Sequence, residues 1–236
     1  MQLKLDLDLQ RGTLLRRYKR FLADIELESG EIITAHCANS GAMTACAEPG
    51  RPVFVSDSHN PKRKLRYTWE LIQMGRTWVG VNTARPNAIA AHAIESRAIP
   101  ELDGYSTLKR EVKYGKEGRS RIDILLSGHT KHPETYVEVK NATMRVGEHA
   151  AFPDAVTARG LKHIEELDYI ARNRGRAVMF FFVGRNDCKR FRPAEEVDSA
   201  YASALRRAAD RVEILAYRFK FSPGKVSLAE KLPVDL

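Results

Sequence analysis

Three residues in the second half of the chain have the types and spacing of a metal-dependent hydrolytic site. Glu138 and Lys140 stand two apart within the apolar residues 136–140. In a strand, both charged side chains would point to one face and the intervening valines into a core. Asp123 lies earlier, within the apolar residues 120–126, and we expect its two isoleucine neighbours on the face opposite to it. The three side chains form one candidate site if the two strands are neighbours.

Two carboxylates and an ammonium suit the hydrolysis of a phosphodiester. A carboxylate within an apolar strand is costly unless it is paired or binds a metal ion. Asp123 and Glu138 would bind one Mg²⁺ or Mn²⁺ through oxygen atoms, and the ion would polarise a phosphate and activate a water. Lys140 would orient that water or neutralise charge on the phosphate. The competing interpretation is a structural Glu138–Lys140 ion pair with Asp123 facing solvent.

The elements before this site predict a first domain, residues 1–84, that is a small β-barrel. Residues 23–28 alternate apolar and acidic side chains and end at the turn residues Ser29 and Gly30, as a half-buried strand before a turn does. Further short strands are expected at residues 32–36, 53–55 and 78–81. Short strands at this spacing are typical of an OB-type barrel, which often binds single strands or oligonucleotides.

The elements around the site predict a second domain, residues 85–236, of α/β type with a mixed sheet. Its expected order is a helix, a hairpin whose turn contains Gly115 and Gly118, a third strand, and then helices alternating with strands. The uniformly apolar residues 177–183 predict a central strand buried on both faces. The expected helices cover residues 88–99, 154–172 and 199–209, and the expected strands cover residues 109–114, 121–126, 136–140, 177–183 and 212–217.

A surplus of basic residues favours a polyanionic partner. Lysine and arginine number 39 against 30 aspartates and glutamates, which gives a net charge of +9 and a pI near 9.5. Such a surface attracts nucleic acid by long-range attraction and counterion release. Basic residues interleaved with aromatic ones suit phosphates and stacked bases, whereas the alternative is a solvated face over core aromatics. The candidate nucleic-acid contacts are Arg16, Arg17, Tyr18, Lys19, Arg20, Lys62, Arg63 and Lys64.

Other features exclude several classes of protein. The three cysteines form no CxxC pair, which predicts reduced thiols and no disulfide framework. No apolar run approaches the ~18 residues of a membrane helix, and the first residues lack the apolar block of a secretion signal. We therefore expect a cytoplasmic protein without a membrane partner. Homo-oligomerisation through an exposed strand stays open, and the absence of cofactor-loop and nucleophile-elbow motifs argues against a small-molecule enzyme.

The site and its surroundings resemble known proteins. The arrangement of Asp123 and then Glu138-Val139-Lys140 resembles the PD-(D/E)XK nuclease superfamily, whose core has the same hairpin, third strand and helix. The whole chain resembles the sugar fermentation stimulation protein A (SfsA) family of bacteria and archaea. The stretches that carry this resemblance are residues 17–24 (RYKRFLAD), 39–43 (NSGAM), 111–115 (EVKYG), 120–123 (SRID), 138–140 (EVK) and 152–157 (FPDAVT), with Arg159, Gly160, Lys162 and His163.

The resemblance implies an OB-fold domain, a nuclease-like domain and DNA binding tied to the regulation of sugar metabolism genes. One departure is that Asp123 follows Ile122, where the nuclease signature usually has proline. A further acid is expected, and Glu111 is preferred over Glu95 because the family stretch includes it.

Residues that follow the site along the chain would contact the phosphate. Thr157, Arg159 and His163 belong to the next expected helix and are candidates for this contact. The arginine is included among the nucleic-acid-binding residues, and the histidine is a weaker candidate for a general base.

Two functions follow from these observations. The first is a DNA-binding protein with an Mg²⁺-dependent, endonuclease-type site that hydrolyses phosphodiesters, with RNA as another substrate. The alternative is a catalytically inactive DNA-binding transcriptional regulator that uses the nuclease fold for binding only. Whether the chain is an enzyme is left open by the sequence.

Overall fold

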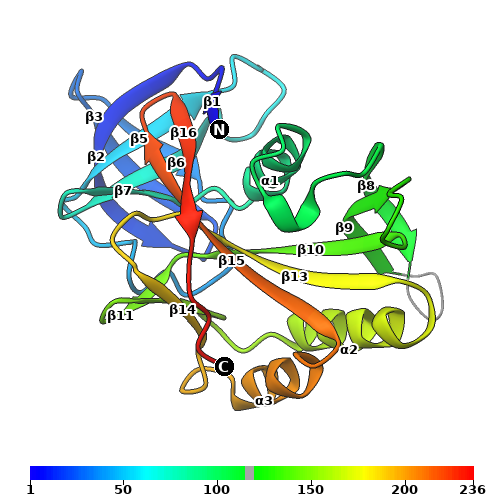
Figure 1. Ribbon diagram of the computed structural model, residues 1–236. Coiled ribbons are helices and arrows are strands. Elements are labelled where there is room, and N and C mark those ends of the chain that lie inside the picture. The colour runs from blue at the N-terminus through cyan, green and yellow to red at the C-terminus, as the bar shows by residue number, and fades with distance from the viewer. Residues whose placement is uncertain (115–119) are drawn as a thin grey trace.

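The structure is a computed structural model that describes residues 1–114 and 120–236, and it shows a barrel joined to a layered α/β unit (Figure 1). This architecture confirms the expected fold class, an N-terminal OB-like barrel followed by a mixed-sheet domain. The expected turn at Gly115 and Gly118 lies outside the described residues. No helix within the described ranges is long and apolar enough to cross a membrane.

The barrel is a curled sheet that closes on itself. Its strands follow the order β4-β3-β2-β5-β6, and a parallel bridge between His36 and Thr68 joins β4 to β6. Alternate residues fill the interior, among them Leu14, Ile25 and Trp69, each 0 % exposed. The strands are β2 (Leu9–Tyr18), β3 (Leu22–Leu27), β4 (Ile32–His36), β5 (Pro52–Asp57), β6 (Tyr67–Met74) and β7 (Thr77–Gly80), the last pairing with β6.

The second unit is built on a seven-stranded mixed sheet with the order β1-β16-β15-β13-β10-β9-β8. The central strands β10, β13 and β15 are parallel, and the outer ones are antiparallel to their neighbours. The strands are β1 (Gln2–Lys4), β8 (Thr107–Tyr114), β9 (Ser120–Ser127), β10 (Thr135–Ala142), β13 (Arg176–Val183), β15 (Val212–Ser222) and β16 (Lys225–Lys231).

Helices cover both faces of this sheet. In Figure 1, α1 (Pro86–Glu95) lies above β10 and β13, and α2 (Ala158–Asn173) and α3 (Ser199–Ala208) lie below them. The expected central strand is confirmed, because the side chains of β13 alternate between the two cores. Phe180 packs on the α1 side and Phe181 on the α2 side, each 0 % exposed.

Several elements differ from the sequence-based expectation. The second helix begins at Ala158 and not at residue 154, because the Thr157 side chain accepts the Gly160 N–H and caps the helix there. The chain also continues past β15 into β16. A small sheet of order β11-β12-β14 was not expected, and its strands are β11 (Met144–Val146), β12 (His149–Phe152) and β14 (Arg190–Pro193); a short 3₁₀ turn, η1 (Pro100–Leu102), follows α1.

The first strand joins the two units. Although it precedes the barrel in sequence, β1 pairs with β16 at the edge of the large sheet. The expected division into residues 1–84 and 85–236 stays a prediction, but residues 2–4 lie in the second unit's sheet. The backbone N–H of Gly80 also donates to Gly184 O at 2.9 Å, which ties β7 to the segment after β13.

Candidate functional site

A pocket lies where the barrel meets the end of the large sheet, and it contains all three residues of the expected site. Asp123, Glu138 and Lys140 line it from β9 and β10. The barrel side contributes Arg20, Asn39, Ser40, Gly41 and Thr83, and the remaining wall includes Asn87, Asn141, Asp154, Val156, Thr157, Arg159 and His163. The site is therefore shared by both units.

Asp123 occupies a point where two strands part. Regular pairing between β9 and β10 ends at Val137 opposite Ile124. The Val139 N–H then donates to Oδ2 of Asp123 at 2.7 Å, and the Asn87 amide donates to its Oδ1 at 2.6 Å. The carboxylate is held by a strand and a helix, and each oxygen keeps a further lone pair for a cation.

The expectation that both isoleucines flanking Asp123 lie on one face is wrong. Ile124 packs in the core on the α1 side, whereas Ile122 packs in the core on the α2 side. Glu111 stands opposite Asp123 between the paired residues of β8 and β9, and its φ is +55°. The alternation is broken there, because a left-handed residue turns the strand.

Glu138 and Lys140 point to the same face, as expected, toward α2. The Lys140 ammonium lies 2.7 Å from Oε1 of Glu138 and 3.1 Å from Nδ1 of His163. The same histidine nitrogen contacts Oε1 of the carboxylate. Glu138 is only 2 % exposed, and its Oε2 is buried without a hydrogen-bond partner among the described residues. Buried polar atoms normally have a hydrogen-bond donor or a cation as a partner, so this oxygen marks a place where such a partner would bind.

The surroundings of the two carboxylates shift their pKa values in opposite directions. Burial and the neighbouring charge of Glu138 raise the pKa of Asp123 to about 7. Burial also acts to raise the pKa of Glu138, but the contacts with His163 and Lys140 outweigh it and lower the pKa. The charged form of Glu138 is thus compensated on one side, whereas that of Asp123 is not.

The two candidates for a further acid lie in different places. Glu111 is close enough for its charge to raise the pKa of Asp123, but it is exposed and does not line the pocket. Glu95 ends α1, whereas Asn87 lies near its start, so about 12 Å of helix separates them. Glu95 lines a separate hollow with Asp103. Neither side chain completes the pocket.

The basic cluster of β2 divides into residues with different partners. Arg17 donates to the carbonyls of Arg20, Asn39, Gly41 and Ala42 and so fixes the barrel loop that borders the pocket. Arg16 and Tyr18 both bind Asp24, and the Arg16 guanidinium also lies over the Tyr18 ring. Lys19 and Arg20 are exposed at the turn that follows, and of this cluster only Arg20 lines the pocket.

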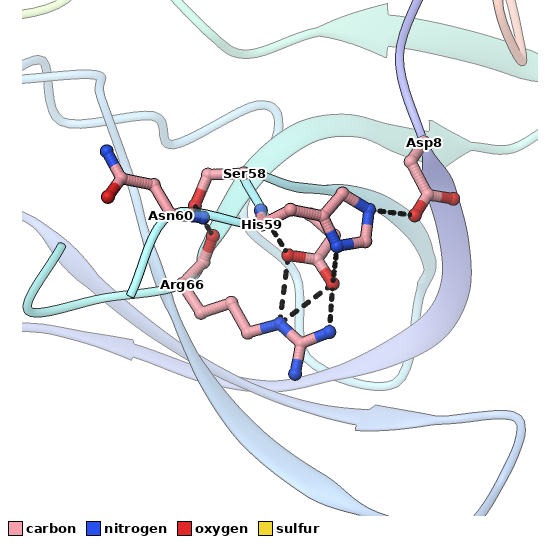
Figure 2. A network of polar contacts seen from close by, with 6 residues as sticks. Asp8, Ser58, His59, Asn60 and Arg66 are labelled. Atoms are coloured by element: carbon pink, nitrogen blue, oxygen red, sulfur yellow. Dashed lines mark hydrogen bonds and ion pairs between the residues drawn. The ribbon is translucent and has the colours of Figure 1, made fainter. Parts of the chain in front are cut away.

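The second basic cluster lies on a loop at another hollow. Arg63 lines that hollow and donates to Thr68, whereas Lys62 and Lys64 are exposed beside it. Two contacts anchor the ends of this loop. Arg66 binds Asp57 through two nitrogens, and His59 contacts Asp8, as Figure 2 shows.

The anchor includes a group of potential metal ligands, Asp8, Asp57 and His59. Arg66 binds both oxygens of Asp57 and lowers its pKa to about 2. The guanidinium therefore takes the place that a cation would need, and the group is a structural anchor for the loop.

Two contributors to the site were missed by sequence reasoning. Asn87 reaches Asp123 from α1 across 36 positions, and Asp154 accepts the Met43 N–H across 111 positions. No local pattern indicates such contacts, although both the loop of residues 39–43 and Asp154 belong to stretches that carried the family resemblance. Asn141 is a further lining residue, and both polar atoms of its side chain are buried without a partner within the described ranges.

A closed OB barrel that shares an acidic pocket with a mixed-sheet unit defines a two-domain class of protein. The model of the sugar fermentation stimulation protein RE domain matches residues 84–225, and that of the SfsA N-terminal OB domain matches residues 15–81. The chain therefore belongs to the sugar fermentation stimulation protein (SfsA) family.

Relatives cover nearly the whole chain. A sugar fermentation stimulation protein homolog of Acidithiobacillus ferrooxidans is 53 % identical over 94 % of this chain and 96 % of its own length. A homolog of Geotalea uraniireducens is 50 % identical over 99 % of this chain and 100 % of its own. The solved structure of Pyrococcus furiosus SfsA in complex with Ca²⁺ has a TM-score of 0.88 and 29 % identity, covering 99 % and 100 % of the two chains. The fold is thus that of the family.

Proposed function

We propose that this protein is a metal-dependent phosphodiesterase that acts on nucleic acid, with DNA as the first substrate to test. The observation that carries the proposal is the buried Oε2 of Glu138, which has no partner among the described residues and belongs to a carboxylate beside Asp123. Two carboxylates that raise each other's energy in a buried pocket favour a divalent cation between them.

The donor set suits a hard cation. Carboxylate oxygens are the ligands that Mg²⁺, Mn²⁺ and Ca²⁺ prefer. Asp123 and Glu138 would hold the ion, and the complex of Pyrococcus furiosus SfsA with Ca²⁺ supports a divalent cation in this family. Such an ion supplies Lewis-acid polarisation of a phosphate and a more acidic water. We propose Mg²⁺ or Mn²⁺ as the cofactor.

The other residues of the pocket would bind and orient the phosphate. Lys140 is fixed by Glu138 and His163, so its ammonium can neutralise charge on a phosphate oxygen without first losing side-chain freedom. The N-terminus of α2, capped by Thr157, borders the same pocket and favours an anion. Arg159, on the first turn of α2, adds a guanidinium to this wall. The resemblance of Asp123 and residues 138–140 to the PD-(D/E)XK sequence pattern supports this proposal.

The direct test is cleavage of labelled single-stranded and duplex oligonucleotides by purified protein with Mg²⁺, Mn²⁺ or EDTA. We expect cleavage that requires the metal and is lost in Asp123→Asn and Glu138→Gln. The matched controls are Asp210→Asn and Glu165→Gln, which change exposed carboxylates away from the pocket and should retain activity. Cleavage that survives in the two site variants would show that another centre, or a contaminant, is responsible. Absence of cleavage with every metal would refute the phosphodiesterase.

A further inference from the structure

We infer that the pocket selects single-stranded nucleic acid over duplex, and that Arg20 and Phe21 of the barrel are the residues that make this selection. This inference rests on the proposed function and names its substrate class. It begins from the turn between β2 and β3, residues 19–21, which reaches the pocket from the barrel.

The turn has an unusual backbone that presents Arg20 to the pocket. Lys19 has a φ of +46° and Arg20 a φ of +63°, both in the left-handed region that residues other than glycine rarely occupy. Arg17 fixes the turn by donating to Arg20 O at 3.1 Å. The Arg20 guanidinium itself donates to no acceptor within residues 1–114 and 120–236, so it is available to a phosphate.

The two walls of the pocket are held together by direct contacts. Met43 of the barrel loop donates its N–H to Asp154 of the opposite wall at 3.1 Å. A Cβ atom on Gly41 would lie 2.2 Å from the Asp154 carboxylate oxygens, so the barrel loop and this carboxylate are in close contact. A strand that reaches the 2 %-exposed Glu138 must therefore enter between two fixed walls. One backbone fits that approach more readily than a duplex, whose second strand adds bulk behind every phosphate.

Exposed apolar side chains in the pocket and next to Arg20 in the sequence offer surfaces for unpaired bases. Val156 lines the pocket and is 78 % exposed, and Phe21, next to Arg20, is 45 % exposed. They are two of the five large hydrophobic side chains that are exposed in the described structure. Bases present free faces to such groups only when they are not stacked within a duplex, and aromatic side chains bind those faces irrespective of sequence. A cation beside an exposed aromatic ring thus suits a single strand.

Binding can be measured apart from cleavage. The full-length protein is titrated against a short fluorescent oligonucleotide without self-complementarity, and against the same oligonucleotide annealed to its complement, in EDTA and again in Ca²⁺. Gels confirm that the oligonucleotide stays intact. We expect the single strand to bind at least about tenfold more tightly than the duplex, as loss of one or two stacked bases and one phosphate contact would predict.

Single substitutions in the turn separate the two contributions. Arg20→Ala should weaken single-strand binding about tenfold and reduce the slope of log affinity against log salt by about 0.7. Arg207→Ala is the matched control, because it removes the same guanidinium from an exposed position of α3 that does not line the pocket, and it should change affinity less than about twofold. Phe21→Ala should weaken binding about fivefold or more and leave the salt slope unchanged, because stacking releases no counterions.

The outcomes also separate this inference from the proposed function. Duplex binding as tight as single-strand binding would overturn the single-strand selection even if metal-dependent cleavage is found. Equal effects of Arg20→Ala and Arg207→Ala would overturn the role of Arg20, since general charge would then explain both. If the wild-type protein binds single strands selectively but cleaves no substrate with any metal, the phosphodiesterase proposal is refuted and the inference about single-strand binding stands.

Discussion

Val139 donates its backbone N–H to the Asp123 carboxylate at 2.7 Å, in the place where a partner strand's carbonyl would otherwise accept it. The carboxylate thus replaces one backbone hydrogen bond between β9 and β10, just beyond their last regular pair. This fixes Asp123 as firmly as the backbone around it. A site residue held in this way needs little reorganisation when a cation binds.

Removal of Asn87 should weaken cation binding without unfolding the protein. Its amide donates to Oδ1 of Asp123 at 2.6 Å and sets the orientation of that carboxylate. We expect Asn87→Ala to reduce Mn²⁺ affinity about tenfold, as loss of a group that orients a metal ligand does. Calorimetric titration measures this, with Asn173→Ala as a control because Asn173 bonds only to its own helix. Unchanged affinity in Asn87→Ala would show that the helix does not orient the site.

The stability of the metal-free protein should depend on the charge of Asp123. The folded chain raises this pKa to about 7, whereas an unfolded chain has a value of about 3.9. The folded state therefore binds the proton more tightly, and its stability falls as pH rises through this window and levels off above it. Asp123→Asn removes this loss, so we expect the variant to gain about 1–3 kcal/mol over wild type at pH 8 and about a third of that at pH 5.

Denaturant unfolding in EDTA at both pH values measures this effect. In Asn, one oxygen can still accept the Val139 N–H, and the Asn87 amide can turn to accept from the new N–H group, so the contacts survive. Asp210→Asn provides the exposed comparison. An equal stability difference at both pH values would contradict the link to ionisation.

Cation affinity should rise with pH over the same range. A proton and a cation compete for Asp123, whose pKa is about 7. Below that value, the apparent Mn²⁺ affinity should increase up to about tenfold per pH unit, and above it the affinity should become constant. Mn²⁺ titrations across this range check the expectation. A flat profile would mean that the ion binds without displacing this proton.

The contact between the barrel loop and Asp154 should appear as coupling between two substitutions. A methyl group on Gly41 would overlap the Asp154 carboxylate, with 2.2 Å between the atoms. Gly41→Ala should cost about 1–3 kcal/mol of unfolding free energy. In the Asp154→Ala background the same change should cost much less, because the obstacle is gone. Additive costs in this cycle would show that the two residues do not meet.

The ion pair between the buried Glu70 and Arg85 should contribute to stability. Glu70 is 4 % exposed and accepts hydrogen bonds from Ser56, Asn82 and Arg85. Arg85→Met leaves that carboxylate without its cation, and we expect a loss of about 2–4 kcal/mol, reduced somewhat because Arg85 is partly exposed. Adding Glu70→Gln should recover part of the loss. Urea unfolding of the three variants measures it, and a double variant no better than Arg85→Met would contradict the pairing.

The local pattern of the sequence predicted much of the fold and part of the site. Strand alternation placed Glu138 and Lys140 on one face, because a period of two is set by the backbone. The same rule failed at Asp123, where a left-handed residue in the neighbouring strand and the parting of two strands interrupt it. Such interruptions depend on tertiary contacts and leave no periodic signal.

Charge clusters were the least informative part of the sequence. Arg17 and Arg20 look equivalent in the sequence, yet one binds four carbonyl groups and the other reaches the pocket. The difference arises from the turn geometry and from a loop more than twenty positions away, as the 22 to 25 positions between Arg17 and its acceptors in that loop show. Long-range partners of this kind decide whether a basic side chain is a structural clamp or a ligand contact.

The pairing of β1 with β16 gives the barrel two attachments to the sheet, one before β2 and one after β7. A domain that is connected at two points rotates little against its neighbour, whereas a domain on a single linker would rotate freely. The pocket between the two units then keeps a constant width. A force on the barrel is transmitted to the edge of the large sheet through β1 and to the start of α1 through the segment after β7. Barrel and sheet are thus expected to melt together as one cooperative body.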